Sequence, residues 1–402
     1  MSRVAACTLF TRNHLPRARV LQCSLHQLHP EMELFMLATD LPGEGRATAG
    51  EAARTWMLGA HDVMAPEQVT RLGALYSAME YCAAFKPALI AHLLGLGYDK
   101  ILYLDTDLLI LNPLDGLIDA LDDASILLTP HLLDPAAARG KEQAELEILL
   151  TGSFNTGFIG VSAGAEADAF LGWWHARVQT HGFDDRANGM FSDQRWMDLA
   201  PGFFGGVKVL RHPGCNVAHW NLHSRTVSQA GDRWLASGQD LVFFHFSGFD
   251  PGNPQVLSKW QDPALPLDPP VAKLAGDYAR ALQEADFDGT SKTPYAFGYF
   301  SNGVPFSWFC RHLLRRAPDL LKEFPRPLDV REPSFFDWLM EPTSHAPDGA
   351  SLSRYAELFH GAHANLQSAF PDPLGQDRQA WHQWLLWNRN HVPEAFVGDL
   401  KQ

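Results

Sequence analysis

The amino-acid sequence has no long run of basic residues and no segment in which basic and aromatic residues alternate. Its 402 residues include 32 Lys and Arg against 46 Asp and Glu, so the formal net charge is −14. Proteins that bind nucleic acid do so mainly through positively charged surfaces. We therefore expect no nucleic-acid partner.

Cysteines are few and widely separated: Cys7, Cys23, Cys82, Cys215 and Cys310. Their number is odd, and no two of them have the C-x-x-C spacing that is typical of zinc sites and redox motifs. A disulfide framework is therefore not expected. We interpret them as reduced core residues of a cytoplasmic protein.

Long apolar runs are also missing, and none approaches the roughly 20 residues that a transmembrane helix requires. The first residues, up to Thr11, contain an apolar run of only about seven residues and no cleavage-type ending, so they do not resemble a secretory signal. Any contact with a membrane is expected to be peripheral.

The composition, with 46% apolar and 19% charged residues, is that of an ordinary globular protein with ample material for a core. The length suits one large α/β domain with an additional region, and there is no internal repeat. Apolar periodicity predicts a strand over residues 4–10, a helix over 15–28 and a strand over 33–39. This βαβ order predicts a mostly parallel sheet whose strand ends meet on one side.

A helix is predicted over residues 69–85, and Lys86-Pro87 is expected to start the next one, which runs to residue 96, because Pro is well tolerated in a first helical turn. Lys86 would then lie at a helix N-terminus, a plausible place for a diphosphate contact, although a lone Lys is usually solvated surface. The further predicted strands are 100–104, 125–129, 154–161, 207–210 and 241–248. A helix or turn is predicted at 113–121, helices at 143–150 and 167–178, and a short helix that is capped by residues 191–194 and runs to residue 199.

The central motif is Asp105-Thr106-Asp107, directly after the apolar strand 100–104. Side chains alternate along a strand, so the two carboxylates should share one side and repel each other unless a cation lies between them. Oxygen ligands beyond the end of a buried strand suit Mg²⁺ or Mn²⁺. A chance D-x-D sequence is the alternative, and the position after a buried strand favours the metal site.

Other polar residues also follow predicted strands, and each has an ordinary structural alternative. Thr11, Asn13 and Asp40 could hold a nucleotide base and ribose, or serve as turn and cap residues. Gly157, in Phe154-Asn155-Thr156-Gly157, marks the close approach of a ligand or backbone, or else a bulged strand. Ser192 or Asp193 could be a helix N-cap, and His245 a hydrogen-bonded core residue rather than a ligand.

A Pro-dense segment, residues 262–270, is predicted to separate a domain at 1–262 from a mainly helical region at 263–402. In the last helix, Trp381 and Trp384 share a face with Leu385, which favours a core stripe over a sugar-binding platform.

Together these motifs resemble GT-A fold glycosyltransferases, most closely the retaining glycosyltransferase family 8 and its bacterial relatives. The resemblance covers residues 4–260 and rests on the order of the motifs. They are Thr11 with Asn13, Lys86, Leu104-Asp105-Thr106-Asp107, Phe154-Asn155-Thr156-Gly157, Asp193-Gln194, Asn216-Val217-Ala218-His219-Trp220-Asn221, and His245-Phe246-Ser247-Gly248 with Lys259-Trp260.

The resemblance implies a nucleotide-sugar donor, with UDP as the expected nucleotide, and a glycan, lipid-linked or protein acceptor. Asp105, Asp107 and His245 would bind Mn²⁺ or Mg²⁺. Asp193 and Gln194 would stabilise the reacting sugar, and we expect retention of the anomeric configuration. The implied donor-binding residues are Thr11, Asn13 and Asp40 at base and ribose, Gly248 and Lys259 at the phosphates, Asn155 and Gly157 at the sugar, Lys86 at sugar or diphosphate, and Thr106 within the carboxylate motif.

Two rival functions remain at this point. A phosphatase of the haloacid dehalogenase type also places D-x-D after an apolar strand, but that motif normally opens its domain. A non-catalytic nucleotide-sugar or glycan-binding protein would not require Asp105, Asp107, His245 and Asp193-Gln194 together. The helical region at 263–402 is expected to shape acceptor recognition or to form a homodimer.

Overall fold

The structure, a computed structural model, describes residues 2–41, 47–48, 54–135, 142–262, 264, 266–331 and 333–400. The chain divides into two compact units. The first contains residues 1–66 and 79–294, and the second contains residues 67–78 and 295–402. Within the described residues, none of the helices combines the length and apolarity that crossing a bilayer requires.

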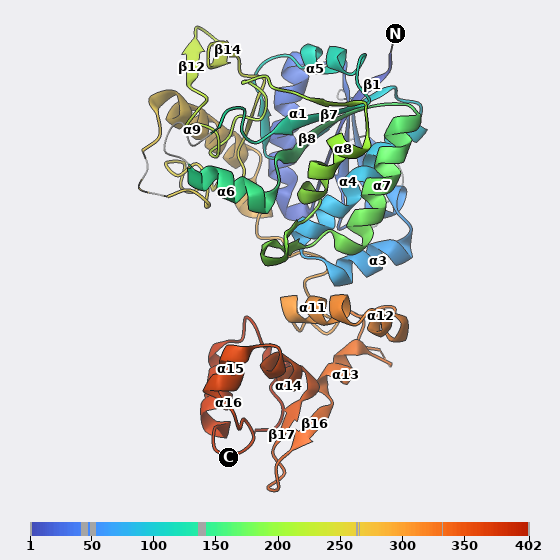
Figure 1. Ribbon diagram of the computed structural model, residues 1–402, viewed down its shortest axis with the longest axis vertical. Coiled ribbons are helices and arrows are strands. Elements are labelled where there is room, and N and C mark those ends of the chain that lie inside the picture. Colours follow the sequence, from blue (N-terminus) through green and yellow to red (C-terminus); the bar gives the residue numbers. More distant parts are fainter. Residues whose placement is uncertain are drawn as a thin grey trace. The chain divides into compact units, whose positions relative to one another are not determined.

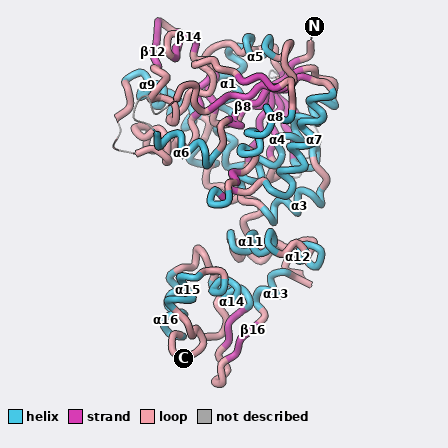
Figure 2. Tube along the Cα trace, viewed as in Figure 1, coloured by secondary structure: helices cyan, strands magenta, loops and turns pink. Residues whose placement is uncertain are grey.

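The centre of the first unit is an eight-stranded sheet (Figures 1 and 2). Its order is β11 (Val207–Val209), β7 (Ile126–Pro130), β8 (Phe154–Ser162), β5 (Lys100–Leu104), β1 (Val4–Phe10), β2 (Glu33–Ala38), β4 (Thr55–Gly59) and β3 (Ala47–Thr48). The pairs β1–β2, β1–β5, β2–β4 and β7–β11 are parallel, whereas β8 is antiparallel to β5 and β7, and β3 to β4. The predicted α/β class with a mostly parallel central sheet is confirmed.

The described helices of the first unit are α1 (Leu15–Leu28), α2 (Ala60–Val63), α4 (Ala78–Gly95), α5 (Asp115–Ala120), α6 (Glu142–Thr151), α7 (Ala165–His181), α8 (Ala200–Phe203), α9 (Pro269–Glu284) and α10 (Phe287–Thr290), with short 3-10 turns η1 (Arg12–His14), η3 (Arg186–Asn188) and η4 (Gln194–Leu199). In Figure 1 the sheet lies between α1 and the pair α4 and α7.

The residues of β5 show how both faces of the sheet are covered. Leu102 joins a buried apolar cluster with Leu21 of α1. Its neighbour Tyr103 points to the opposite face, where Lys86 of α4 lies 5.0 Å from the centre of the Tyr103 ring. All five residues of β5 are buried, as predicted, so the carboxylates that follow come directly after a fully enclosed strand.

A separate two-stranded sheet pairs β6 (Leu108–Ile110) with β15 (Phe243–His245) in antiparallel orientation. The strand predicted over residues 241–248 is therefore shorter than expected, since β15 covers only Phe243–His245. β15 pairs with the short strand that follows Asp107, and the register sets His245 opposite Leu108. The remaining small sheets pair β9 (Asp184–Asp185) with β10 (Met190–Phe191), and join β12 (Val227–Ala230), β13 (Arg233–Ala236) and β14 (Gln239–Asp240).

The predicted helix break at Lys86-Pro87 is wrong. α4 runs without interruption through both residues, and Pro87 lies inside it. The earlier helix, α3 (Pro66–Leu75), ends instead before Tyr76. An interior Pro costs one helical hydrogen bond, here to the carbonyl of Ala83, and the burial of α4 on the sheet outweighs that loss. Lys86 consequently projects from the middle of a helix.

Helix α9 belongs to the first unit, although it follows the Pro-dense segment. Its buried residues, among them Leu274 and Tyr278, pack with Phe246 and Phe249 in one apolar cluster. The compact units thus divide after residue 294. Residue 263, the first of the predicted C-terminal region, lies outside the described residues, and the role assigned to that region stays a prediction.

The second unit is built from α3 and a mainly helical C-terminal part, which contains α11 (Trp308–Arg316), α12 (Asp319–Glu323), α13 (Phe335–Met340), α14 (Arg354–Gly361), α15 (Ala364–Ala369), α16 (Arg378–Trp387), η5 (Glu394–Phe396) and the hairpin β16 (Pro342–His345) with β17 (Ser351–Ser353). The core stripe predicted in the last helix is confirmed, since Trp381 and Leu385 are fully buried.

Arginines of α11 hold α3 within this unit. The Arg311 guanidinium donates to the carbonyls of Gly73 and Phe297, and Arg315 Nε donates to Leu75 O at 2.7 Å. Two carbonyls in the last turn of α3, those of Gly73 and Leu75, are therefore satisfied by side chains from more than 200 positions later in the chain.

Candidate metal and nucleotide-sugar site

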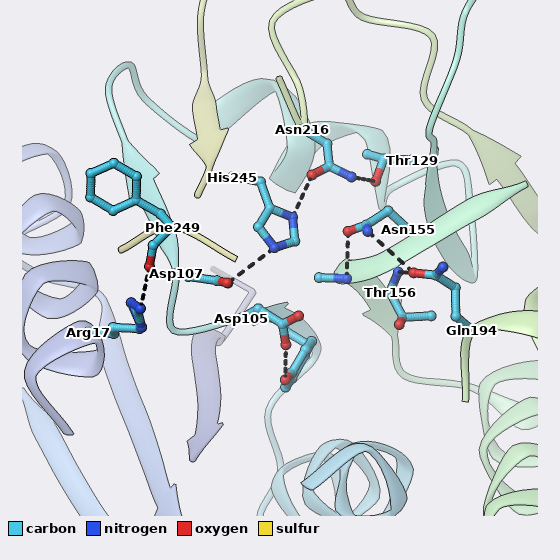
Figure 3. A network of polar contacts seen from close by, with 12 residues as sticks. Arg17, Asp105, Asp107, Thr129, Asn155, Thr156, Gln194, Asn216, His245 and Phe249 are labelled. Carbon is cyan, nitrogen blue, oxygen red and sulfur yellow. Dashed lines mark hydrogen bonds and ion pairs between the residues drawn. The ribbon is translucent and has the colours of Figure 1, made fainter. Parts of the chain in front are cut away.

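Asp105, Asp107 and His245 form a compact group of potential metal ligands. Each offers one ligand atom, and these three atoms lie within 4.8 Å of one another. Figure 3 shows the three side chains directed toward a common space. Two carboxylates and an imidazole match the donors that Mn²⁺ accepts, and a divalent ion would fit between them.

The local backbone explains this convergence. The Asp105 N–H donates to Gly157 O at 2.8 Å, and the Leu108 N–H donates back to Asp105 O at 3.1 Å, so the chain turns directly after β5. The Phe246 N–H donates to Asp107 O at 2.9 Å, which continues the β6–β15 pairing up to the carboxylate. The carboxylates are thus brought together by a turn rather than by alternation along a strand.

Asp107 and His245 form an ion pair, with His245 Nε2 3.1 Å from Asp107 Oδ1. Burial alone would raise the pKa of Asp107, but the nearby His245 outweighs burial and lowers the pKa. Burial likewise would lower the pKa of His245, and Asp107 reverses this and raises the pKa. A divalent cation held by the two side chains would take the place of the proton on His245 Nε2.

Lys86 lies deeper, between two carboxylates. Its Nζ is 3.5 Å from Asp105 Oδ1 and 3.3 Å from Asp193 Oδ2, and it donates to Thr156 O at 3.0 Å. Burial lowers the pKa of Lys86, but Asp105 and Asp193 outweigh it, so the net pKa is raised. Asp105 and Asp193 therefore stabilise the ammonium form of Lys86, next to the candidate metal ligands.

Asp193 and Gln194 start the 3-10 turn η4, but the Asp193 side chain makes no capping hydrogen bond. Burial raises the pKa of Asp193, and Lys86 only partly opposes this. Gln194 Nε2 donates to Thr151 O at 2.7 Å, while its Oε1 accepts from Asn155 Nδ2 at 3.3 Å. The pair is thus directed toward Lys86 and Asn155, as Figure 3 shows for Gln194.

Asn155 and Gly157 lie in an irregular part of β8. The register between β7 and β8 shifts after Leu128, and Asn155 Oδ1 accepts from the Gly157 N–H at 2.9 Å. A Cβ on Gly157 would come 2.5 Å from His245 Cε1. The group that lies close to Gly157 is thus the imidazole of His245, a candidate metal ligand. The strand is also irregular at this point.

The residues expected at base and ribose lie at the ends of β1 and β2. Thr11 Oγ1 donates to Asn13 Oδ1 at 2.6 Å. The buried carboxylate of Asp40 accepts from the Arg12 N–H at 2.9 Å and from Arg12 Nε at 3.2 Å. These contacts gather the residues on one edge, and their role in nucleotide binding stays a prediction.

Gly248, Lys259 and Thr106 complete the predicted set. Gly248 has a φ of +72°, and its carbonyl accepts from the Lys259 N–H at 3.0 Å. The Lys259 side chain is exposed and lies 4.6 Å from the ring centre of Trp260. Thr106, which stands between the two Asp residues in the sequence, is buried. Phosphate contacts from these residues remain predictions.

Sequence reasoning assigned no role to several residues that shape the site. Tyr103 donates its hydroxyl to Asp105 Oδ1, and Thr156 accepts from Lys86. The charge of Arg17 contributes to the lowered pKa of Asp107, although the interaction with His245 lowers this pKa more. Asn216 contacts His245 directly. The contact between Tyr103 and Asp105 could have been predicted, because side chains two residues apart in a strand lie on the same side. The other contacts depend on tertiary structure.

No protein-family model matches the chain. Two Bacillus subtilis (strain 168) proteins are similar in sequence. The uncharacterized protein YfnF is 28% identical over 251 residues, which is 61% of this chain and 81% of YfnF. The uncharacterized protein YfnD is 28% identical over 255 residues, 62% of this chain and 79% of YfnD.

Among solved structures, the galactosyltransferase LgtC in complex with donor and acceptor sugar analogs is similar with 16% identity and a TM-score of 0.40, over 72% of this chain and 97% of LgtC. The glycosyltransferase GlyE of Streptococcus pneumoniae TIGR4 has 12% identity and a TM-score of 0.39, over 75% of this chain and 67% of GlyE.

Proposed function

We propose that this chain is a metal-dependent GT-A glycosyltransferase, which moves a sugar from a nucleotide-sugar donor, with UDP as the expected nucleotide, to a glycan, lipid-linked or protein acceptor in the cytoplasm. The observation that carries the proposal is the convergence of Asp105, Asp107 and His245 beside the buried Lys86. The order of motifs that resembles retaining glycosyltransferase family 8 supports it.

The chemistry of this arrangement fits the departure of a nucleoside diphosphate. Asp105, Asp107 and His245 would hold Mn²⁺ or Mg²⁺, which supplies Lewis-acid stabilisation of the leaving diphosphate. Lys86 adds a fixed positive charge within 3.5 Å of Asp105. Because Lys86 is buried and held by Thr156, its electrostatic contribution needs little reorganisation during the reaction.

Asp193 and Gln194 would stabilise the sugar during its transfer. A sugar that loses its phosphate passes through an oxocarbenium-like state, which a carboxylate or amide oxygen can stabilise. Gln194 is too weak a nucleophile for a committed covalent intermediate. We infer attack by the acceptor hydroxyl on the same face, with retention, and with the leaving phosphate oxygen as the base. An NMR analysis of the product that shows the inverted anomer would contradict this step.

The test is nucleotide release from a panel of UDP-, GDP- and TDP-sugars with Mn²⁺. The wild type should hydrolyse one donor slowly, and Asp107→Ala and His245→Ala should abolish this release. Asp119→Ala, in the exposed part of α5, serves as a matched control for loss of a carboxylate and should retain release. No release by the wild type, together with no metal-dependent nucleotide binding by calorimetry, would contradict the proposed function.

A further inference from the structure

Burial separates two residues with left-handed backbone conformation, Ser192 and Asn216, from ordinary turn residues. Four non-glycine residues of the described chain have positive φ: Ser192, Asn216, Ser237 and Asp286. Ser237 and Asp286 are exposed, as is usual for turns. Asn216, by contrast, is completely buried at a φ of +59°. Strained backbone of this kind persists only where the surroundings hold it, and it is concentrated at functional sites.

Both polar atoms of the Asn216 carboxamide make hydrogen bonds. Its Oδ1 lies 3.0 Å from His245 Nδ1, and its Nδ2 donates to Thr129 Oγ1 at 3.1 Å. Since the oxygen can only accept, Nδ1 of the imidazole must carry a proton. When His245 is neutral, its lone pair is therefore on Nε2, the nitrogen that faces Asp107.

The turn that carries Asn216 is held from several sides. Asn221 Nδ2 donates to Asn216 O at 2.9 Å and to His131 O at 3.1 Å, and Asn221 Oδ1 accepts from the Ala218 N–H at 3.0 Å. Arg225 donates to Cys215 O at 2.6 Å. These bonds stabilise a conformation that Asn tolerates better than most residues, and they fix the direction of its side chain.

Trp220 restrains the imidazole on another side, with its ring centre 5.3 Å from that of His245 in an edge-on arrangement. Together, Asn216 and Trp220 leave His245 little freedom to rotate. Two residues of the Asn216 motif, which the resemblance quoted without a role, thus contact the candidate ligand His245.

We propose that Asn216 is a positioning residue for the metal site: it holds His245 with the proton on Nδ1 and the Nε2 lone pair directed toward the space between Asp105 and Asp107. The inference rests on the proposed metal-dependent function. Partners of this kind behind a metal-bound imidazole fix its tautomer and ring orientation, and their loss typically reduces metal affinity about 10- to 100-fold.

The test compares Asn216→Gly with Asn216→Asp. Gly adopts the left-handed backbone without strain and removes only the carboxamide, so the turn should persist. Mn²⁺ affinity, measured from the free-ion signal in electron paramagnetic resonance, should fall at least about 10-fold in Asn216→Gly. Asn216→Asp keeps an acceptor for Nδ1 and should bind Mn²⁺ like the wild type. Ser237→Gly, at an exposed residue with a φ of +49°, is the control for the backbone change and should leave Mn²⁺ affinity unchanged.

A spectroscopic signature separates positioning from general loss of structure. Bound Mn²⁺ should show the ¹⁴N modulation of a coordinated imidazole in the wild type and in Asn216→Asp, and this modulation should weaken or vanish in Asn216→Gly. Equal affinity and equal modulation in Asn216→Gly and the wild type would overturn the role of Asn216 alone. If the wild type itself does not bind Mn²⁺, the metal site is wrong, and the proposed function and this inference both fall.

Discussion

Lys86 Nζ lies 3.3 Å from Asp193 Oδ2, and the two side chains are only 7% and 5% exposed. They come from the middle of α4 and from the start of η4, so a buried ion pair joins two elements that are more than 100 positions apart in the sequence. Removal of one partner would leave an uncompensated charge in the interior, which is far costlier than removal of both.

Lys86→Met should therefore lower the free energy of unfolding by about 3 kcal/mol, as measured by urea denaturation followed by circular dichroism. The double variant Lys86→Met with Asp193→Asn should recover part of this loss because the buried charge is removed. Lys322→Met, which breaks an exposed pair with Asp319, is the control and should leave the midpoint unchanged. A similar small effect in both single variants would show that the buried pair does not stabilise the fold.

Gly157→Ala should disturb the metal site through a single added methyl group. The new Cβ would lie 2.5 Å from His245 Cε1 and 2.7 Å from Asn155 Oδ1, so the imidazole must move. We expect overpacking to cost about 1–3 kcal/mol of stability, and calorimetry should show weaker Mn²⁺ binding.

Gly172→Ala is the matched control, because Gly172 is an exposed residue of α7 at which an added Cβ meets no heavy atom of the described chain within 4 Å. This change should stabilise the protein slightly, since Ala has the higher helix propensity, and should leave Mn²⁺ binding intact. Wild-type Mn²⁺ affinity in Gly157→Ala would mean that His245 is not tightly placed.

In the second unit, Trp381→Ala should cost about 3–5 kcal/mol, because this fully buried ring would leave a large cavity. Its ring stacks on Trp384 at a centroid distance of 5.3 Å. Trp387 is 79% exposed, so Trp387→Ala should change stability by less than about 0.5 kcal/mol. Thermal unfolding followed by far-ultraviolet circular dichroism compares the two variants. Equal destabilisation would contradict the assignment of Trp381 to the core.

Arg311→Met should loosen α3, because the carbonyls of Gly73 and Phe297 would lose a charged donor. We expect a loss of about 2 kcal/mol and faster amide hydrogen exchange in peptides that cover residues 67–78. Arg316→Met, at an exposed residue of the same helix, should leave that exchange unchanged. Unchanged exchange in Arg311→Met would show that α3 holds its place without this side chain.

The local sequence pattern predicted the bounds of helices and strands correctly where burial and periodicity agree. The strands at 4–10 and 100–104 and the helix at 15–28 have the bounds that the sequence predicts, because each combines a clear apolar pattern with a polar or Pro boundary. Pro87 shows where local pattern fails. Its strongest local preference is the first turn of a helix, but the burial of α4 places it in the interior.

The site shows the same division between local and tertiary information. The Asp105-Thr106-Asp107 motif could be identified because it follows a buried strand, and His245 was joined to it only through the family resemblance. The contact between Asn216 and His245 joins residues 29 positions apart through a turn with positive φ at a non-glycine residue. No propensity rule predicts such a turn, since the bonds that hold it come from side chains elsewhere, such as Asn221.

The assignment of residues 67–78 to the second unit bears on how the protein is made. During synthesis α3 leaves the ribosome long before α11, whose arginines bond to its last carbonyls. All strands of the main sheet are therefore synthesised before α3 can form these hydrogen bonds. A nascent chain that stalls before α11 would therefore expose the last turn of α3 without these hydrogen bonds.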